Sequence, residues 1–164
     1  MKKMIAGSTA VLALWLAVLF VLLRIFYVPS RSMEPYCKAG SFVICRRYPY
    51  FFGDPTPDYG TVVVFKCDEK GKLLVKRVVG LAGDMIEFSD GYLVRNGEQI
   101  KEAYLPKQGV SECEITFVVP DNSIFVLGDN RRASSDSRKL NNPYIPLEDI
   151  IAEVMITIPL PEIR

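Results

Sequence analysis

The 164-residue sequence contains no histidine. This absence excludes every catalytic pair in which a histidine activates a serine or a cysteine, and every zinc site that needs a histidine ligand, such as HExxH. If the protein is a hydrolase with a serine nucleophile, another side chain must accept the proton of the hydroxyl. The remaining candidate is a lysine that burial keeps neutral.

An excess of charge of either sign is also missing. Lys and Arg total 20 against 19 Asp and Glu. The basic residues Lys2, Lys3 and Arg24 precede Val28, which leaves 17 basic against 19 acidic residues in the rest of the chain. We therefore expect no nucleic-acid partner, because no basic field would attract one.

One long apolar run stands near the N-terminus. The 20 residues from Met4 to Leu23 carry no charge, which is about the length that a helix needs to cross ~30 Å of hydrocarbon. A cleaved secretory signal is the alternative, but its apolar core is usually ~7 to 15 residues long and ends at a small-x-small site. The sequence predicts that residues 1–28 form a cytoplasmic tip and a retained transmembrane anchor. Positive charges on both flanks leave its orientation open.

The remaining residues, 29–164, are predicted to form one β-rich domain, since short β-branched and aromatic runs alternate with turn residues and no long helical period interrupts them. Asn96-Gly97 favours a hairpin, and Lys101 to Glu114 is the expected loop. The fold class is mostly β: a mainly antiparallel β-domain that follows a single N-terminal transmembrane helix. The expected strands are residues 41–45, 61–66, 73–80, 85–88, 92–96, 114–119, 123–128 and 152–158.

Two polar segments could supply a serine and its base. VPSRSMEPY places Ser30 and Ser32 shortly after the apolar run. In the strand LLVKRVVG, alternation puts Lys76 on the face of Leu74 and Val78, where desolvation disfavours the ammonium form. A lysine that reaches solvent at the sheet edge is the alternative, and periodicity alone favours it.

A third polar segment is GDNRRASSDSR, residues 128–138, which follows a predicted strand. Its Ser, Asp, Asn and Arg residues are typical of tight turns and hydrogen-bonded networks. This composition is typical of a surface loop. It is equally what we expect if the segment is the third part of a site that folding assembles from distant segments.

The segments PSRSMEP, YGTVVVF, VKRVVGLAGD and GDNRRASSDSR, in this order, resemble the conserved boxes of bacterial type I signal peptidases. The likeness covers essentially the whole chain from Arg24 to Pro161, and all the boxes together are a specific signal. The resemblance implies a Ser-Lys endopeptidase, with a fold shared with self-cleaving repressors, that removes signal peptides from exported preproteins after small residues of the Ala-x-Ala type. It implies neither a cofactor nor a metal.

The resemblance also implies roles for single residues. Ser32 matches the nucleophile, Lys76 the general base, and Ser134 the serine that orients this lysine. The hydroxyl of Ser30 and the backbone N–H of Ser32 match the oxyanion-binding groups. The residues that match the braced loop are Gly128, Asp129, Asn130, Asp136 and Arg138. Those that match the walls of shallow substrate pockets are Val28, Pro29, Met33, Leu74 and Val75.

On this resemblance the N-terminus is cytoplasmic and the β-domain extracytoplasmic, with membrane lipid and signal-peptide-bearing preproteins as partners. Eight positions separate Arg24 from Ser32, which is at most ~29 Å of extended chain and would hold the nucleophile near the membrane surface. Four cysteines on the exported side could pair in three ways or stay free: Cys37, Cys45, Cys67 and Cys113.

Two other functions remain open from the sequence. A conjugative or pilin-specific peptidase of the same clan would keep Ser32 and Lys76 but act on one dedicated precursor. A non-catalytic, membrane-anchored module that binds exported chains belongs to a different class, and the intact serine and lysine segments argue against it.

Overall fold

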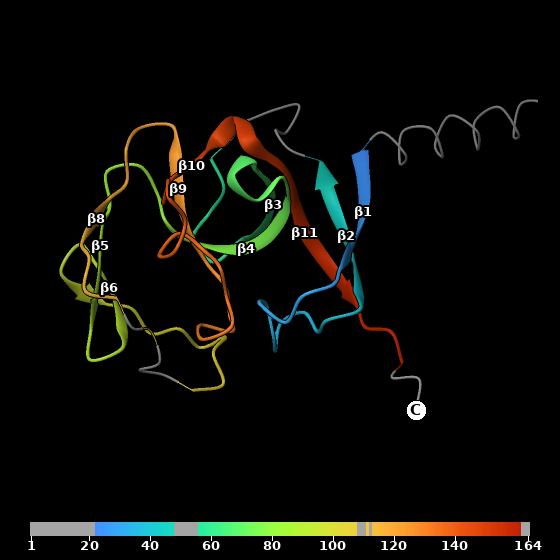
Figure 1. Cartoon of the computed structure of the whole chain (residues 1–164), viewed down its shortest axis with the longest axis horizontal. Coiled ribbons are helices and arrows are strands. Elements are labelled where there is room, and N and C mark those ends of the chain that lie inside the picture. Colours follow the sequence, from blue (N-terminus) through green and yellow to red (C-terminus); the bar gives the residue numbers. More distant parts are fainter. Residues whose placement is uncertain (1–21, 48–55, 108–110, 112, 162–164) are drawn as a thin grey trace, which may run out of the picture.

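The computed structural model describes residues 22–47, 56–107, 111 and 113–161. Most of the predicted anchor lies outside the described residues. In the part that is described, no helix is long and apolar enough to cross a membrane. The described chain forms two antiparallel sheets at opposite ends of the molecule (Figure 1), which confirms the mostly β, antiparallel fold class.

The larger sheet carries its strands in the order β1-β2-β11-β3-β4-β9-β10. The C-terminal strand β11 lies between β2 and β3, so the two ends of the described chain complete one sheet. Its strands are β1 (Leu23–Val28), β2 (Ser41–Arg47), β3 (Val62–Cys67), β4 (Lys72–Gly80), β9 (Ser123–Leu127), β10 (Ile145–Pro146) and β11 (Ile150–Ile158).

The smaller sheet, in the order β7-β6-β5-β8, is inserted between β4 and β9. Asn96 and Gly97 both have positive φ, 55° and 81°, as the predicted tight hairpin between β6 and β7 requires. Its strands are β5 (Met85–Ser89), β6 (Tyr92–Arg95), β7 (Glu98–Gln99) and β8 (Phe117–Val118). Two short 3-10 helices, η1 (Asp68–Lys70) and η2 (Leu147–Asp149), complete the described elements.

Each predicted strand overlaps an observed one, whereas β1 lies in the segment assigned to the anchor. β1 pairs with β2 along its whole length, from Leu23↔Arg46 to Val28↔Ser41. Its alternation is hidden in the sequence, because the exposed positions Ile25 and Tyr27 are as apolar as the inward-facing Phe26 and Val28. The sheet therefore begins at Leu23, before the expected domain boundary at residue 28.

Strand β4 lies where the buried clusters of the molecule meet. Val78 packs into a buried cluster with residues of β3 and β9. Val75 packs against a second cluster, which contains residues of β1, β2 and β11. Val79 packs into a third cluster, which includes the smaller sheet. A side chain in the middle of β4 is therefore surrounded by protein on both faces. This position buries Lys76 to 2% exposure.

Candidate active site

The serine and the lysine that the sequence singled out lie in contact. The Nζ atom of Lys76 is 2.8 Å from the Oγ atom of Ser32, across 44 positions of sequence, and 2.7 Å from the carbonyl oxygen of Val75. Ser32 sits at the start of a series of turns after β1, which the wholly buried side chain of Met33 fixes to the core. Since Ser32 is itself 7% exposed, water has little access to the pair.

Burial controls the protonation of Lys76. Loss of hydration lowers the pKa of its amine from the usual 10.5 to about 8, although the carboxylates of Asp136 and Asp129 act in the opposite direction. Both carboxylates are held in ion pairs of their own, with Arg138 and Arg77. A substantial neutral fraction of the amine is therefore available near neutral pH.

Arg77 is a site residue that the sequence analysis did not select. It lies on the face of β4 opposite Lys76 and forms a two-pronged pair with Asp129, at 2.9 Å and 2.6 Å. Its guanidinium also stacks over the rings of Tyr36 and Tyr104. The pair ties the lysine strand to the loop of residues 128–138. The only signal for Arg77 in the sequence was its charge within an otherwise apolar part of the strand.

The loop of residues 128–138 is braced from within by Asp136. Its carboxylate accepts hydrogen bonds from the backbone N–H of Gly128, at 3.0 Å, and from the guanidinium of Arg138, at 2.9 Å for both contacts. Burial raises the pKa of Asp136, but the hydrogen bonds and charge of Arg138 outweigh this effect and the net shift is downward. Asp136 therefore stays ionised and holds the turn in place.

The same loop is tied directly to Ser32. The backbone N–H of Asn130 donates a 3.0 Å hydrogen bond to the carbonyl oxygen of Ser32. At Gly128 a Cβ atom would clash with the Oγ of Ser134 and would lie 2.5 Å from the carbonyl oxygen of Ser32. No side chain fits at this position, so a glycine is required where the loop passes Ser32.

Ser134 lies at this close approach, but it does not bind Lys76 in the structure. Its Oγ atom is buried, and its hydroxyl helps to lower the pKa of the Asp136 carboxyl. The contacts of the Lys76 amine are instead Ser32 and the carbonyl of Val75. The expected orienting contact is therefore not formed here.

Ser30 lies beside Ser32 on the solvent side, with its Oγ atom 3.1 Å from that of Ser32. Ser30 is exposed, so its hydroxyl can turn toward an incoming group. Among the residues that the structure describes, no acceptor binds the backbone N–H of Ser32. These two donors are the ones that the sequence resemblance assigned to an oxyanion.

The predicted pocket walls fall into two groups. Val28, Met33 and Val75 pack against one cluster beneath β1, with Pro29 exposed beside them. Leu74 packs into a different cluster on the other face of β4. The structure thus brings Val28, Met33 and Val75 together and leaves Leu74 apart, because neighbouring residues of a strand point to opposite faces.

All four cysteines are free thiols. Cys37 and Cys45 are buried in the cluster beneath β1, and burial raises the pKa of Cys45 to about 12, so this thiol stays protonated. Within the described ranges, no group of three or more Cys, Asp and Glu side chains could hold a metal ion.

Comparison with known proteins identifies the family. The model of the signal peptidase family, peptidase S26, matches residues 1–158. The chain belongs to this signal peptidase family. It is 31% identical over 154 residues to "Probable signal peptidase I-1" of Synechocystis sp., covering 84% of this chain and 74% of that protein. It is 32% identical over 165 residues to signal peptidase I P of Bacillus subtilis subsp. natto, covering 90% and 89%.

The fold of this signal peptidase agrees with a solved relative. A crystal structure of a signal peptidase I from Enterococcus faecalis has a TM-score of 0.54 and 26% identity, covering 63% of this chain and 100% of that one. The family resemblance read from the sequence is therefore confirmed, and the chain is a peptidase whose matched span includes Ser32, Lys76 and residues 128–138.

Proposed function

We propose that this signal peptidase is a membrane-bound serine endopeptidase that cleaves signal peptides from exported preproteins with Ser32 as nucleophile and Lys76 as general base. The contact of 2.8 Å between the buried amine and the hydroxyl carries the proposal. In a chain without histidine, a desolvated lysine is the group that can activate a serine.

The arrangement supports each proton transfer of an acyl-transfer mechanism. The neutral Lys76 amine accepts the proton of Ser32 as its Oγ attacks the scissile carbonyl, and the ammonium then protonates the leaving amine. The backbone N–H of Ser32 and the hydroxyl of Ser30 donate to the oxyanion; in comparable sites one such donor contributes on the order of 10²-fold or more. A water molecule that transfers its proton to Lys76 hydrolyses the acyl-enzyme and restores the serine.

An unpaired stretch of sheet edge offers a place for the substrate strand. β4 pairs with β9 only from Arg77 onward, so residues 72–76 have no described strand on that side. β1 is likewise an edge strand of the larger sheet. An extended peptide that adds to these edges would run past Val28, Met33 and Val75 toward Ser32. Since these side chains are already packed in a core cluster, only shallow space remains for small residues before the cut.

The position of β1 supports an anchored, extracytoplasmic site. β1 starts at the end of the predicted anchor and exposes apolar residues of the kind that contact lipid. β11, two strands away in the sheet, also exposes apolar residues. The exposed residues are Ile25, Tyr27, Ile156 and Ile158. The catalytic serine lies only four residues beyond β1, so a signal peptide held in the bilayer would present its cut site close by.

The test is cleavage of a preprotein with an Ala-x-Ala site by the full-length protein in lipid vesicles, with the new N-terminus sequenced. We expect a cut after the second Ala that is lost in Ser32→Ala and Lys76→Met, and retained in Lys72→Met, where the same change falls on the exposed end of β4. Cleavage that persists in Lys76→Met excludes Lys76 as the base. Cleavage of a single pilin-type precursor alone would favour a dedicated peptidase, and binding without any cleavage a non-catalytic module.

A further inference from the structure

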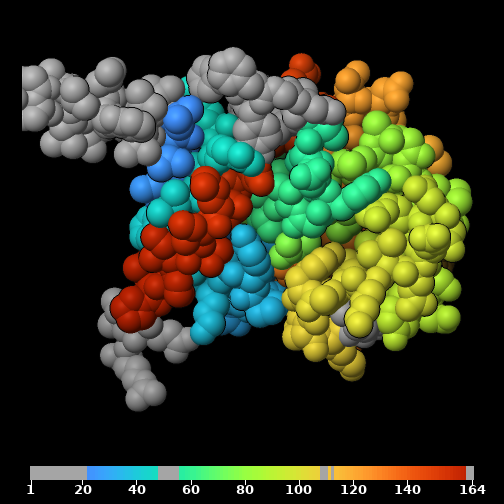
Figure 2. Space-filling view, turned by 180° about the vertical axis from the view of Figure 1, so that it is seen from behind, coloured from blue at the N-terminus to red at the C-terminus, as the bar shows by residue number. Residues whose placement is uncertain are grey.

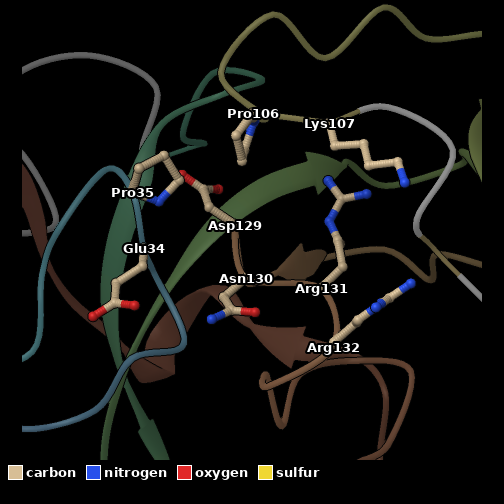
Figure 3. A pocket seen from close by; sticks show the side chains of 8 residues that line it. All are labelled: Glu34, Pro35, Pro106, Lys107, Asp129, Asn130, Arg131 and Arg132. Atoms are coloured by element: carbon tan, nitrogen blue, oxygen red, sulfur yellow. The ribbon is translucent and has the colours of Figure 1, made fainter.

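A hollow lies beside the turn that follows Ser32, and no residue of β1 lines it. It has a volume of about 390 Å³ and is open to solvent. Figure 3 shows the side chains that line it. They come from the turn after Ser32, from the loop of residues 128–138 and from Pro106 and Lys107. The residues that matter here are Glu34, Pro35, Lys107, Asn130 and Arg132.

The chain fixes this hollow relative to the scissile bond. Glu34 and Pro35 follow Ser32 by two and three positions, and Asn130 on the opposite wall binds the Ser32 carbonyl through its backbone N–H. The proposed pocket walls Val28 and Pro29 precede Ser32 instead. The part of a substrate before the cut lies along β1, so the part after the cut must leave toward Glu34 and Asn130. In Figure 2 the blue segment after β1 and the yellow segment that leads to Lys107 lie side by side, in agreement with the lining of the hollow.

The charged groups of the hollow are of two kinds. Asp129 and Arg131 are buried and fully engaged, Asp129 with Arg77 and Arg131 with Glu102 and Ser111. Lys107 and Arg132 are exposed and form no ion pair or hydrogen bond with any described residue. The carboxylate of Glu34 accepts a long 3.4 Å hydrogen bond from the backbone of Ala39. Two cations are therefore available to a ligand at the rim, against one carboxylate.

We propose that this hollow receives the first residues of the mature chain, immediately after the cut, and selects an acidic side chain among them through Lys107 and Arg132. This inference rests on the proposed function and adds a specificity on the leaving side of the bond. A carboxylate placed between two exposed cations gains about 0.2–1 kcal/mol per pair, which corresponds to a preference of several-fold over a neutral residue. The gain is screened by salt, because all these groups are near solvent.

The experiment compares preproteins that differ only in the mature part, with Glu, Gln or Lys at each of the first three positions after the cut. Full-length protein in neutral lipid vesicles is assayed for kcat/KM. With the wild type we expect Glu to exceed Gln, and Gln to exceed Lys, by several-fold at one of the positions, with the difference shrinking as salt is added. In the double variant K107E/R132E the order of the three substrates should reverse, and this comparison of rates within one variant does not depend on its overall activity.

A matched control separates the hollow from the overall charge of the protein. The double variant K66E/K101E introduces the same charge change at two exposed residues outside the hollow, and it should leave the wild-type order intact. Equal rates for Glu, Gln and Lys substrates at all three positions would refute the inference and leave the proposed function standing. The same holds if the order fails to reverse in K107E/R132E, or if K66E/K101E reverses it. Failure of the wild type to cleave any of these substrates would overturn both.

Discussion

Burial of Lys76, the proposed general base, should measurably lower the stability of the folded protein. The lysine is 2% exposed, and its pKa falls from 10.5 to about 8 because the folded protein desolvates the ammonium. At about 1.4 kcal/mol per pH unit, this difference corresponds to about 3 kcal/mol of unfavourable free energy in the folded state whenever the amine is protonated. Lys76→Met keeps most of the side-chain volume and removes the charge.

The sign of the pH dependence of stability follows from the protons that the folded and unfolded states bind. Below a pH of about 8 the folded and unfolded states both carry the proton, so the penalty is fully present. Between about 8 and 10.5 the folded state releases the proton while the unfolded state keeps it, and the wild type gains stability as the pH rises. Above 10.5 both states are neutral and the penalty is gone. The advantage of Lys76→Met should therefore decrease by about 3 kcal/mol across this window.

The hydrogen bonds of Lys76 also affect the difference in stability between Lys76→Met and the wild type at neutral pH. Methionine loses the contacts to Ser32 and to the Val75 carbonyl, which contribute about 0.5–1.5 kcal/mol each. We expect Lys76→Met to be more stable than the wild type by about 0–2 kcal/mol at neutral pH, and less stable by about 1–3 kcal/mol near pH 11.

The assay is urea unfolding of the full-length protein in detergent micelles, followed by far-ultraviolet circular dichroism from neutral pH to about pH 11. Lys66→Met, at the exposed position of the neighbouring strand β3, is the control and should show almost no pH-dependent difference from the wild type. If the difference between Lys76→Met and the wild type stayed constant across the window, folding would not lower the lysine pKa, and the reasoning would be refuted.

Two further predictions concern activity. Because the base must be neutral in the free enzyme, kcat/KM should rise with pH and level off above a pH of about 8, and Lys76→Arg should be inactive throughout because a guanidinium stays protonated. Gly128→Ala should lower kcat by on the order of 100-fold, since a Cβ 2.5 Å from the Ser32 carbonyl must displace the nucleophile, and such a displacement of about 1 Å has that effect.

Each of these two activity predictions has an outcome that would contradict it. An activity profile that is flat from pH about 6 to 10 would show that no lysine of lowered pKa limits the reaction. For Gly128→Ala, the added change Ser134→Ala removes the contact with Oγ but leaves the 2.5 Å contacts with the Cβ atom of residue 134 and with the Ser32 carbonyl, so activity should stay low. Full recovery in the double variant would place the clash at the Ser134 hydroxyl alone.

Strand positions could be predicted because their causes are local. A run such as LLVKRVVG is rich in β-branched residues and is bounded by turn residues, which favours a strand whatever surrounds it. Asn96-Gly97 specifies its turn through the positive φ values that both residues adopt. β1 was missed because its exposed residues Ile25 and Tyr27 are apolar, so the alternation that marks a strand is invisible in the sequence. β7 and β10 are two residues long and offer no period to detect.

Candidate residues were harder to place than strands, because a contact between distant segments leaves no local trace. The alternation of β4 put Lys76 and Leu74 on one face, but it also allowed a lysine that reaches solvent at the sheet edge. The pairing of Arg77 with Asp129, across 52 positions, and the separation of Leu74 from Val75 into different clusters depend on which segments pack against each face.

The sequence by itself determined the chemistry that remains possible: without histidine, an activated serine needs a lysine, and the ordered segments around Ser32 and Lys76 identified the family. Only the tertiary structure decided that the two atoms lie 2.8 Å apart and that both are shielded from water. The reason is physical. The low pKa of the lysine comes from the side chains that displace its hydration, and those side chains reach it only when β1, β4 and the loop of residues 128–138 come together.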